Sequence, residues 1–178
     1  MGLKLRAGDF LQASFSSKFD VITMWATLEH LPEPNRYLRT SLQWLRPGGI
    51  LLASVPNFSS ITQRLIGTKD RYVGIDHLNY WTARGFASYV GGFGFDIVET
   101  VTSGFNPMTL IRDYRSATHA VECEQMAVEQ TQVASIKGSW VRHVHRGVEK
   151  LLNVGLLGDS VAVAGRLRGR GDFSSPRA

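Results

Sequence analysis

The chain has 178 residues, of which 43% are hydrophobic and 20% are charged. These values are typical of a globular domain with a hydrophobic core, and they exclude a low-complexity or disordered chain. A single cysteine, Cys123, excludes an intramolecular disulfide and a multi-cysteine metal site. We expect a cytoplasmic protein, because the sequence shows no signal peptide and no apolar run long enough to span a bilayer.

The net charge of +5 comes from the last quarter of the chain. From Lys137 onward there are 8 basic and 3 acidic residues, whereas the preceding part is neutral. A basic end can steer anionic partners, but a solvated helix face and a disordered basic tail over 169–178 also fit. We expect no nucleic-acid partner, because "RGRG" lacks a neighbouring aromatic stacking platform.

The first third of the chain alternates between strand-like and helix-like patterns. "KLRAGDF" (4–10) indicates the end of a strand that turns at Gly8, and "FDVITMWA" (19–26) predicts a strand buried on both faces. Leucines spaced along 34–45 predict a helix, which "RPGG" (46–49) ends with a turn. "ILLASVP" (50–56) predicts the next strand. This succession is the βαβ pattern of a parallel sheet.

The rest of the chain continues the pattern after a polar stretch over 57–81. Thr82 is a candidate N-cap for a helix that carries Phe86, Tyr89, Val90 and Phe93 on one face. Further strands are predicted over 96–102 and 160–168. Residues 112–135 are weakly patterned and are interpreted as a lid or insertion. An amphipathic helix is then indicated by Trp140, Val144, Val148, Leu151 and Leu152.

Four passages resemble, in order, class I S-adenosylmethionine-dependent methyltransferases of the ubiquinone-biosynthesis-like, small-molecule branch. They are "GDF", "FDVITMWATLEHLPEP", "LQWLRPGGILLASVPN" and "DHLNYWTARGFASYVGGFGFDIVE". The resemblance implies an α/β, Rossmann-like fold in which these passages form strands 3 to 7 of a mostly parallel seven-stranded sheet. The expected strand order is 3-2-1-4-5-7-6, with the last strand antiparallel. The cofactor implied is S-adenosylmethionine.

The glycine-rich cofactor loop of that family has no counterpart in the sequence. "GGFG" (91–94) and "GLLGD" (155–159) precede predicted strands, whereas the cofactor loop follows one, so both are interpreted as turns. We therefore expect residues 1–168 to be the C-terminal part of a methyltransferase domain, truncated at the N-terminus. A fragment, a misplaced start, one half of a split enzyme and a remnant with another role all fit.

The resemblance implies cofactor contacts at the ends of the third and fourth strands. Ligands in open parallel sheets lie beyond the carboxyl ends of the strands, where the strand order reverses. The carboxylate of Asp9 is expected to accept a hydrogen bond from the adenine amino group, and Phe10 to lie against the ring. The complete set of expected cofactor-binding residues is Asp9, Phe10, Met24, Trp25, Ala26 and Glu29.

The adjacent Glu29 and His30 are interpreted first as residues that shape the pocket and fix a turn. Methyl transfer from a sulfonium depends on alignment of donor and acceptor, and a base is needed only when the acceptor must lose a proton. His30 is therefore the weaker of two catalytic candidates.

His77 is the stronger catalytic candidate, because it lies where this family builds its acceptor pocket. The expected substrate contacts around it are Asp76, Asn79, Tyr80 and Trp81, which combine polar groups with aromatic rings. Capping of the helix that begins after Thr82 is an equally weighted role for His77. We expect no metal site, because the five histidines are scattered along the chain.

Two functions follow. The first is methyl transfer to a small-molecule acceptor, incomplete in this chain. The second is a non-enzymatic half-Rossmann module that pairs with a polypeptide supplying the missing N-terminal strands. An unpaired apolar strand edge is the physical basis of the second.

Overall fold

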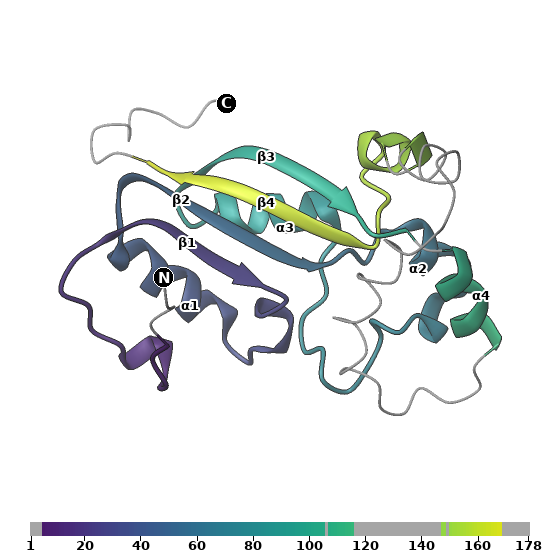
Figure 1. The fold of residues 1–178 in the computed structure, drawn as a ribbon, viewed down its shortest axis with the longest axis horizontal. Helices are drawn as coiled ribbons and strands as arrows, with labels where there is room; N and C mark the ends of the chain where they lie inside the picture. The colour runs from purple at the N-terminus through teal and green to yellow at the C-terminus, as the bar shows by residue number, and fades with distance from the viewer. Residues whose placement is uncertain (1–4, 106, 116–146, 149, 169–178) are drawn as a thin grey trace.

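A computed structural model describes residues 5–105, 107–115, 147–148 and 150–168, and it contains one four-stranded sheet (Figure 1). The strands are β1 (Phe19–Trp25), β2 (Leu45–Pro56), β3 (Phe95–Ser103) and β4 (Ser160–Leu167). Their order is β1-β2-β4-β3; β1 and β2 are parallel, and β4 is antiparallel to both of its neighbours. This confirms the expected order 4-5-7-6 and the antiparallel last strand.

Helix α1 (Pro34–Trp44) connects β1 to β2 and begins with a proline, which is preorganised for the first helical turn. Leu38 is fully buried on its inner face. The helix ends one residue earlier than expected, because Leu45 already pairs with Phe19 in the sheet. The predicted turn at 46–49 forms an irregularity within β2: the pairing moves from Phe19↔Leu45 to Val21↔Ile50, and Gly48 has φ +76°.

Helix α3 (Ala83–Gly91) begins as predicted at Thr82, whose hydroxyl accepts a hydrogen bond from the Gly85 amide at 3.0 Å. Its apolar face, with Phe86 and Val90 fully buried, packs against β3 and β4. The helix ends in a turn that contains Gly94 at φ +92°. "GGFG" is therefore a turn, as expected.

A single hydrophobic core lies between the helices and one face of the sheet. It joins Leu38 of α1 and Phe86 of α3 to alternate residues of the strands, so both helices cover the same face. The core residues are Met24, Leu28, Leu38, Leu45, Leu51, Ala53, Val55, Ala83, Phe86, Val90, Phe95, Val161 and Val163. The other face is less covered: Val21 is 47% exposed and Trp25 is 55% exposed.

Asn57, at the end of β2, joins three parts of the fold. Its amide nitrogen donates to the carbonyl oxygens of Leu156 and Gly158 at 2.9 and 2.8 Å. Its side-chain oxygen accepts from the Ala83 amide at the start of α3 and from Ser59. Because the residue is buried and its polar atoms are paired, it fixes the carboxyl edge of the sheet.

The strand end predicted before the turn at Gly8 is wrong for the described residues 5–7. These residues carry no ladder, and a short 3₁₀ turn, η1 (Phe10–Gln12), follows. The Asp9 carboxylate accepts a hydrogen bond from the Leu11 amide at 2.9 Å and so caps that turn. The physical reason is that this segment has no neighbouring strand with which to exchange backbone hydrogen bonds.

Short helices form where the sequence indicated loops. They are α2 (Ile61–Ile66), the 3₁₀ helix η3 (Gly67–Lys69) and α4 (Pro107–Arg115). Ser60 caps α2 by accepting from the Gln63 amide, a Ser-x-x-Gln pattern that could have predicted the helix. Figure 1 shows α2 and α4 beyond the end of the sheet where β2 ends and β4 begins.

Several expectations fall wholly or partly outside the described residues. These are the lid interpretation beyond residue 115, the helix positions Trp140 and Val144, and the tail over 169–178. Residues 147–148 and 150–154 are helical as predicted, although Leu151 is 74% exposed. Among the described helices, none combines the length and the apolar character that crossing a membrane requires.

Candidate functional site

The carboxyl end of β1 leads into a tight backbone turn. Met24 is buried in the core, whereas the next residue, Trp25, is exposed. Ala26 follows at φ +45°, a conformation that is uncommon for a residue with a Cβ atom, and its amide donates to the Ser54 carbonyl at 3.0 Å. This hydrogen bond extends the β1–β2 ladder and aims the following residues beyond the sheet edge.

The turn after Ala26 is η2 (Leu28–His30), and the segment after residue 77 holds it in place. The Glu29 carbonyl accepts hydrogen bonds from the amides of Leu78 and Asn79 at 2.8 and 3.1 Å. The Asn79 side chain donates to the carbonyls of Leu28 and Leu31 at 3.2 and 2.7 Å. Asn79, expected as a substrate contact, is therefore bonded to this turn.

Glu29 carries a buried carboxylate. It is 1% exposed, and its Oε2 atom has no hydrogen-bond partner in the described part of the chain. Burial raises the pKa of Glu29, and its backbone hydrogen bond together with His30 and His77 partly offsets that rise. A carboxylate that costs free energy to bury without a partner is typical of a site built for a ligand or a proton.

His30 and His77 meet beside that carboxylate. Their ring centroids are 4.7 Å apart in an edge-to-face arrangement. His30 Nε2 lies 3.9 Å from Glu29 Oε1, and His30 Nδ1 is 2.9 Å from the Asp76 carbonyl oxygen. His77 Nδ1 is 2.7 Å from the Tyr72 carbonyl oxygen. His77 caps no helix, since Thr82 caps α3 itself.

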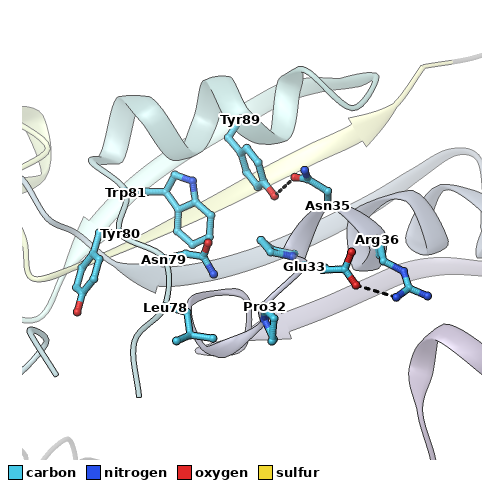
Figure 2. Close-up of a pocket in the computed structure, with 10 residues that line it drawn as sticks. Pro32, Glu33, Asn35, Arg36, Leu78, Asn79, Tyr80, Trp81 and Tyr89 are labelled. Carbon is cyan, nitrogen blue, oxygen red and sulfur yellow. Dashed lines mark hydrogen bonds and ion pairs between the residues drawn. The ribbon is translucent and has the colours of Figure 1, made fainter. Parts of the chain in front are cut away.

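An open cavity of about 480 Å³ lies next to this cluster, between the start of α1 and the segment before α3. Figure 2 shows Trp81 and Tyr89 on one side and Leu78 and Pro32 on the other. The Tyr89 hydroxyl donates to the Asn35 side chain at 2.6 Å, and Glu33 pairs with Arg36 at 2.8 Å. Its full lining is Pro32, Glu33, Pro34, Asn35, Arg36, Leu78, Asn79, Tyr80, Trp81 and Tyr89.

The structure thus divides the expected acceptor site into two neighbouring parts. Asn79, Tyr80 and Trp81 line the cavity, whereas Asp76 and His77 lie in the histidine cluster. Tyr80 connects the parts, because its ring centroid lies 6.4 Å from that of His77. The cavity thus combines aromatic rings with the polar side chains of Glu33, Asn35, Arg36 and Asn79.

The remaining cofactor candidates lie in different surroundings. Asp9 is exposed, and Phe10 is half-buried with its ring stacked on Tyr37, the centroids 6.1 Å apart. Trp25 is more than half exposed at the edge strand. The Met24 side chain packs in the core, so contact with a ligand there would involve its backbone.

Sequence reasoning missed the cavity walls contributed by α1 and by Tyr89. Pro32 and Glu33 lie in the family-like passage "FDVITMWATLEHLPEP" but were not expected as contacts, and Asn35 and Arg36 follow it. All four line the cavity together with Trp81. The one available signal was the position of these residues directly after the strand exit, where ligands gather in parallel sheets.

Comparison with protein families gives one match, which decides the affiliation. Residues 5–100, more than half of the chain, match the model of a family described as "Methyltransferase domain". The chain belongs to this methyltransferase family. The resemblance noted in the sequence is confirmed at the level of class I methyltransferases, and the cofactor that the family implies is S-adenosylmethionine. No curated protein matches the sequence significantly.

Solved structures agree on this fold at low sequence identity. A methyltransferase of Thermotoga maritima, described as a possible histamine N-methyltransferase, has a TM-score of 0.53 at 13% identity, covering 89% of this chain and 61% of that one. The [4+2]-cyclase SpnF gives 0.52 at 18% identity, with coverages of 92% and 55%. A Haloferax volcanii putative methyltransferase, solved in complex with the Trm112 activator, gives 0.50 at 13% identity, with coverages of 92% and 60%.

This chain spans about 55–61% of the length of these structures. Among the described residues β1 is an edge strand, and buried Met24 and exposed Trp25 lie at its carboxyl end, where open α/β sheets place their ligands. The described part includes no glycine-rich loop that follows a strand. Its glycine pairs lie before β3 and in the irregular part of β2.

Proposed function

We propose that this chain forms the acceptor side of an S-adenosylmethionine-dependent methyltransferase that acts on a small molecule. The observation that carries the proposal is the cavity at the carboxyl edge of β1 and β2, walled by Trp81, Tyr89 and the start of α1. Membership of the methyltransferase family supports the reaction type. The size and aromatic lining of the cavity support a small acceptor.

The proposed cofactor contacts lie along the exposed side of β1. Trp25 and Ala26 would form one wall of the cofactor site. The η2 turn, which carries Glu29, would close the end of the site. Asp9 and Phe10 would meet the adenine end, with the Asp9 carboxylate acting as an acceptor only. The Asp9 oxygen that does not cap η1 would remain available for this contact.

S-adenosylmethionine supplies an activated methyl group, so this chain's task is to hold the acceptor in line with it. Trp81 and Tyr80 would position the acceptor by ring contacts and polar tips, while Asn79 keeps the η2 turn in place. His77 would accept the acceptor's proton at Nε2, since its Nδ1 is held by the Tyr72 carbonyl. Water would be excluded there, because His77 is 8% exposed.

The first test is a calorimetric titration of the 178-residue chain with S-adenosylhomocysteine. Micromolar binding supports the proposal. Small hydroxyl and amine compounds would then be screened for transfer of a labelled methyl group. We expect His77→Ala to reduce this transfer about 100-fold and to leave the affinity for S-adenosylhomocysteine unchanged. Equal turnover in His77→Ala would remove the base role. No heat from a folded sample would contradict methyl transfer by this chain alone.

A second candidate function is pairing with another polypeptide that supplies the missing strands. The favouring observation is that, among the described residues, β1 pairs only with β2 and leaves its other edge open, and that Phe19, Val21 and Trp25 are exposed on it. In this role the chain would be a half-Rossmann module, and any catalysis would belong to the assembly.

A further inference from the structure

Three potential metal ligands converge at the exit of β1. Glu29, His30 and His77 each present one ligand atom, and these atoms lie within 4.8 Å of one another. Two come from the η2 turn and the third from the segment before α3. The backbone hydrogen bonds between Glu29 and the amides of Leu78 and Asn79 hold the two segments together.

The hydrogen bonds of the two histidines fix which nitrogen is available. In each ring Nδ1 lies within hydrogen-bond distance of a backbone carbonyl oxygen, that of Asp76 for His30 and that of Tyr72 for His77. A carbonyl oxygen can only accept, so each Nδ1 must carry the hydrogen. In the neutral rings both Nε2 atoms therefore keep their lone pairs. A carbonyl-bonded Nδ1 is the usual outer contact of a metal-ligating histidine.

The carboxylate completes the set. Glu29 is buried, and its Oε2 atom lacks a hydrogen-bond partner in the described residues. Its Oε1 lies 3.9 Å from His30 Nε2, too far for a hydrogen bond. Among the described residues no lysine or arginine forms an ion pair with this carboxylate, so its negative charge leaves room for a cation.

We propose that Glu29, His30 and His77 bind one divalent first-row metal ion of the zinc class. Two imidazoles and one carboxylate suit Zn²⁺ or Fe²⁺, whereas Mg²⁺ and Ca²⁺ prefer oxygen ligands alone. Two histidines and one glutamate are also the ligand set of catalytic zinc sites that leave one coordination position open. His30 has a side chain that is 33% exposed, which gives a fourth ligand access from solvent.

The spacing requires a small adjustment on binding. Tetrahedral zinc with bonds of about 2.1 Å places its ligands roughly 3.4 Å apart. The ligand atoms here lie within 4.8 Å of one another, so their separations must close by up to about 1.4 Å. Rotation of the half-exposed His30 ring would supply much of this movement. The Asp76 carboxylate, 3.9 Å from His30 Nδ1, would strengthen that ring as a ligand.

Metal binding and the base role of His77 compete for the same nitrogen. A cation bound at Nε2 removes the lone pair that would accept a proton. This part of the inference rests on the proposed function, whereas the binding site itself does not. Metal affinity is therefore the quantity to measure, because it needs neither a cofactor nor an acceptor.

The experiment is a titration of the metal-free full chain with Co²⁺, followed by visible absorption, and then competition with Zn²⁺. We expect one equivalent of Co²⁺ to give the ligand-field bands of nitrogen and oxygen coordination, and Zn²⁺ to abolish them. Glu29→Gln, His30→Ala and His77→Ala should each weaken binding at least about tenfold, since removing even an outer contact has such an effect.

The matched control is Glu99→Gln, which removes an exposed carboxylate from β3 and should leave the titration unchanged. Circular dichroism of each variant establishes that it is folded. His30→Ala should disturb the packing of the fold least, because the His30 side chain is half-exposed. Absence of the bands in the folded parent chain would overturn the proposal. Bands of equal strength in all three ligand variants would also overturn it, by placing the ion elsewhere.

Discussion

At the scale of single residues, Asp159 carries a buried carboxyl group whose charge opposes folding, as that of Glu29 does. It lies just before β4, is 6% exposed, and has one carboxylate oxygen without a partner in the described residues. Burial raises the pKa of Asp159 to about 6, and the nearby Asp70 adds to the rise while Arg71 and hydroxyl groups of α2 reduce it. The structure thus keeps a carboxyl group where its ionised form is disfavoured.

We expect the stability of the chain to fall as pH rises from about 4 to about 6. Because the folded-state pKa lies above the ordinary value of 3.8, the folded state binds more protons in this window. The shift of about two units corresponds to roughly 3 kcal/mol of unfolding free energy, lost by pH 7. Asp159→Asn should therefore be more stable than the parent at pH 7 and depend less on pH, as measured by urea unfolding.

The control is Asp20→Asn, which removes a carboxylate that is 77% exposed and paired with Arg46. Asp20→Asn removes the same charge as Asp159→Asn, but it does so at an exposed position where the charge carries no cost of burial. If Asp159→Asn is no more stable than the parent at pH 7, and has the same pH slope, the carboxyl group is not penalised in the folded state.

At the scale of elements, Gly158 sets how closely the start of β4 approaches the end of β3. A Cβ atom built on Gly158 would lie 2.6 Å from the Ser103 amide nitrogen and 2.8 Å from its carbonyl oxygen. The Gly158 carbonyl also accepts from Asn57, so the backbone has little freedom to withdraw. We expect Gly158→Ala to lower the free energy of unfolding by about 1–3 kcal/mol in chemical denaturation.

Gly91→Ala is the matched control, because a Cβ there would have ordinary contacts of 3.6 Å and would lie at the end of α3. We expect that change to be neutral or slightly stabilising. Equal stability of the Gly158→Ala chain and its parent would mean that the strands separate more easily than their hydrogen bonds indicate.

The pattern of apolar residues predicted those helices and strands in which apolar side chains recur at regular spacing and face the core. β1, β3 and β4, with α1 and α3, were expected within a few residues, because apolar periodicity reports burial directly. The strand end predicted before Gly8 failed because a strand also needs a partner, which local sequence does not encode. The short α2 depends on the cap at Ser60 more than on its few apolar residues.

The site was predicted only in part, for a similar reason. Trp81 and Tyr80 were expected from their place before α3, and they do line the cavity. The meeting of His30 with the segment around Asp76, 46 residues away, depends on backbone hydrogen bonds between two turns. Turns of this kind follow no period, so residue spacing gave no indication that the two histidines would meet.

At the scale of the whole molecule, the described sheet is covered on one face and open at the β1 edge. An edge strand whose outer backbone groups are unpaired, and whose apolar side chains are exposed, is a template for association. We expect the purified chain to self-associate in sedimentation velocity, and Val21→Lys to shift it toward the monomer, because an edge lysine opposes strand pairing.

The same substitution at Val98 provides the control. Val98 is 59% exposed on β3, the opposite edge strand, so Val98→Lys matches the change in charge and in strand propensity. A parent chain that sediments as a monomer, or an equal response to both substitutions, would show that β1 is not the surface through which the chain associates.

The hydrogen bonds of Asn57 reach Leu156 and Gly158, which are 99 and 101 residues further along the chain. β1, α1 and β2 are neighbours in sequence and pair through short loops, so they are able to assemble first. The central strand β4 must close a loop of about 100 residues before it pairs with β2, and such closure is entropically costly. We therefore expect the pairing of β4 with β2 to form late in folding and to slow it.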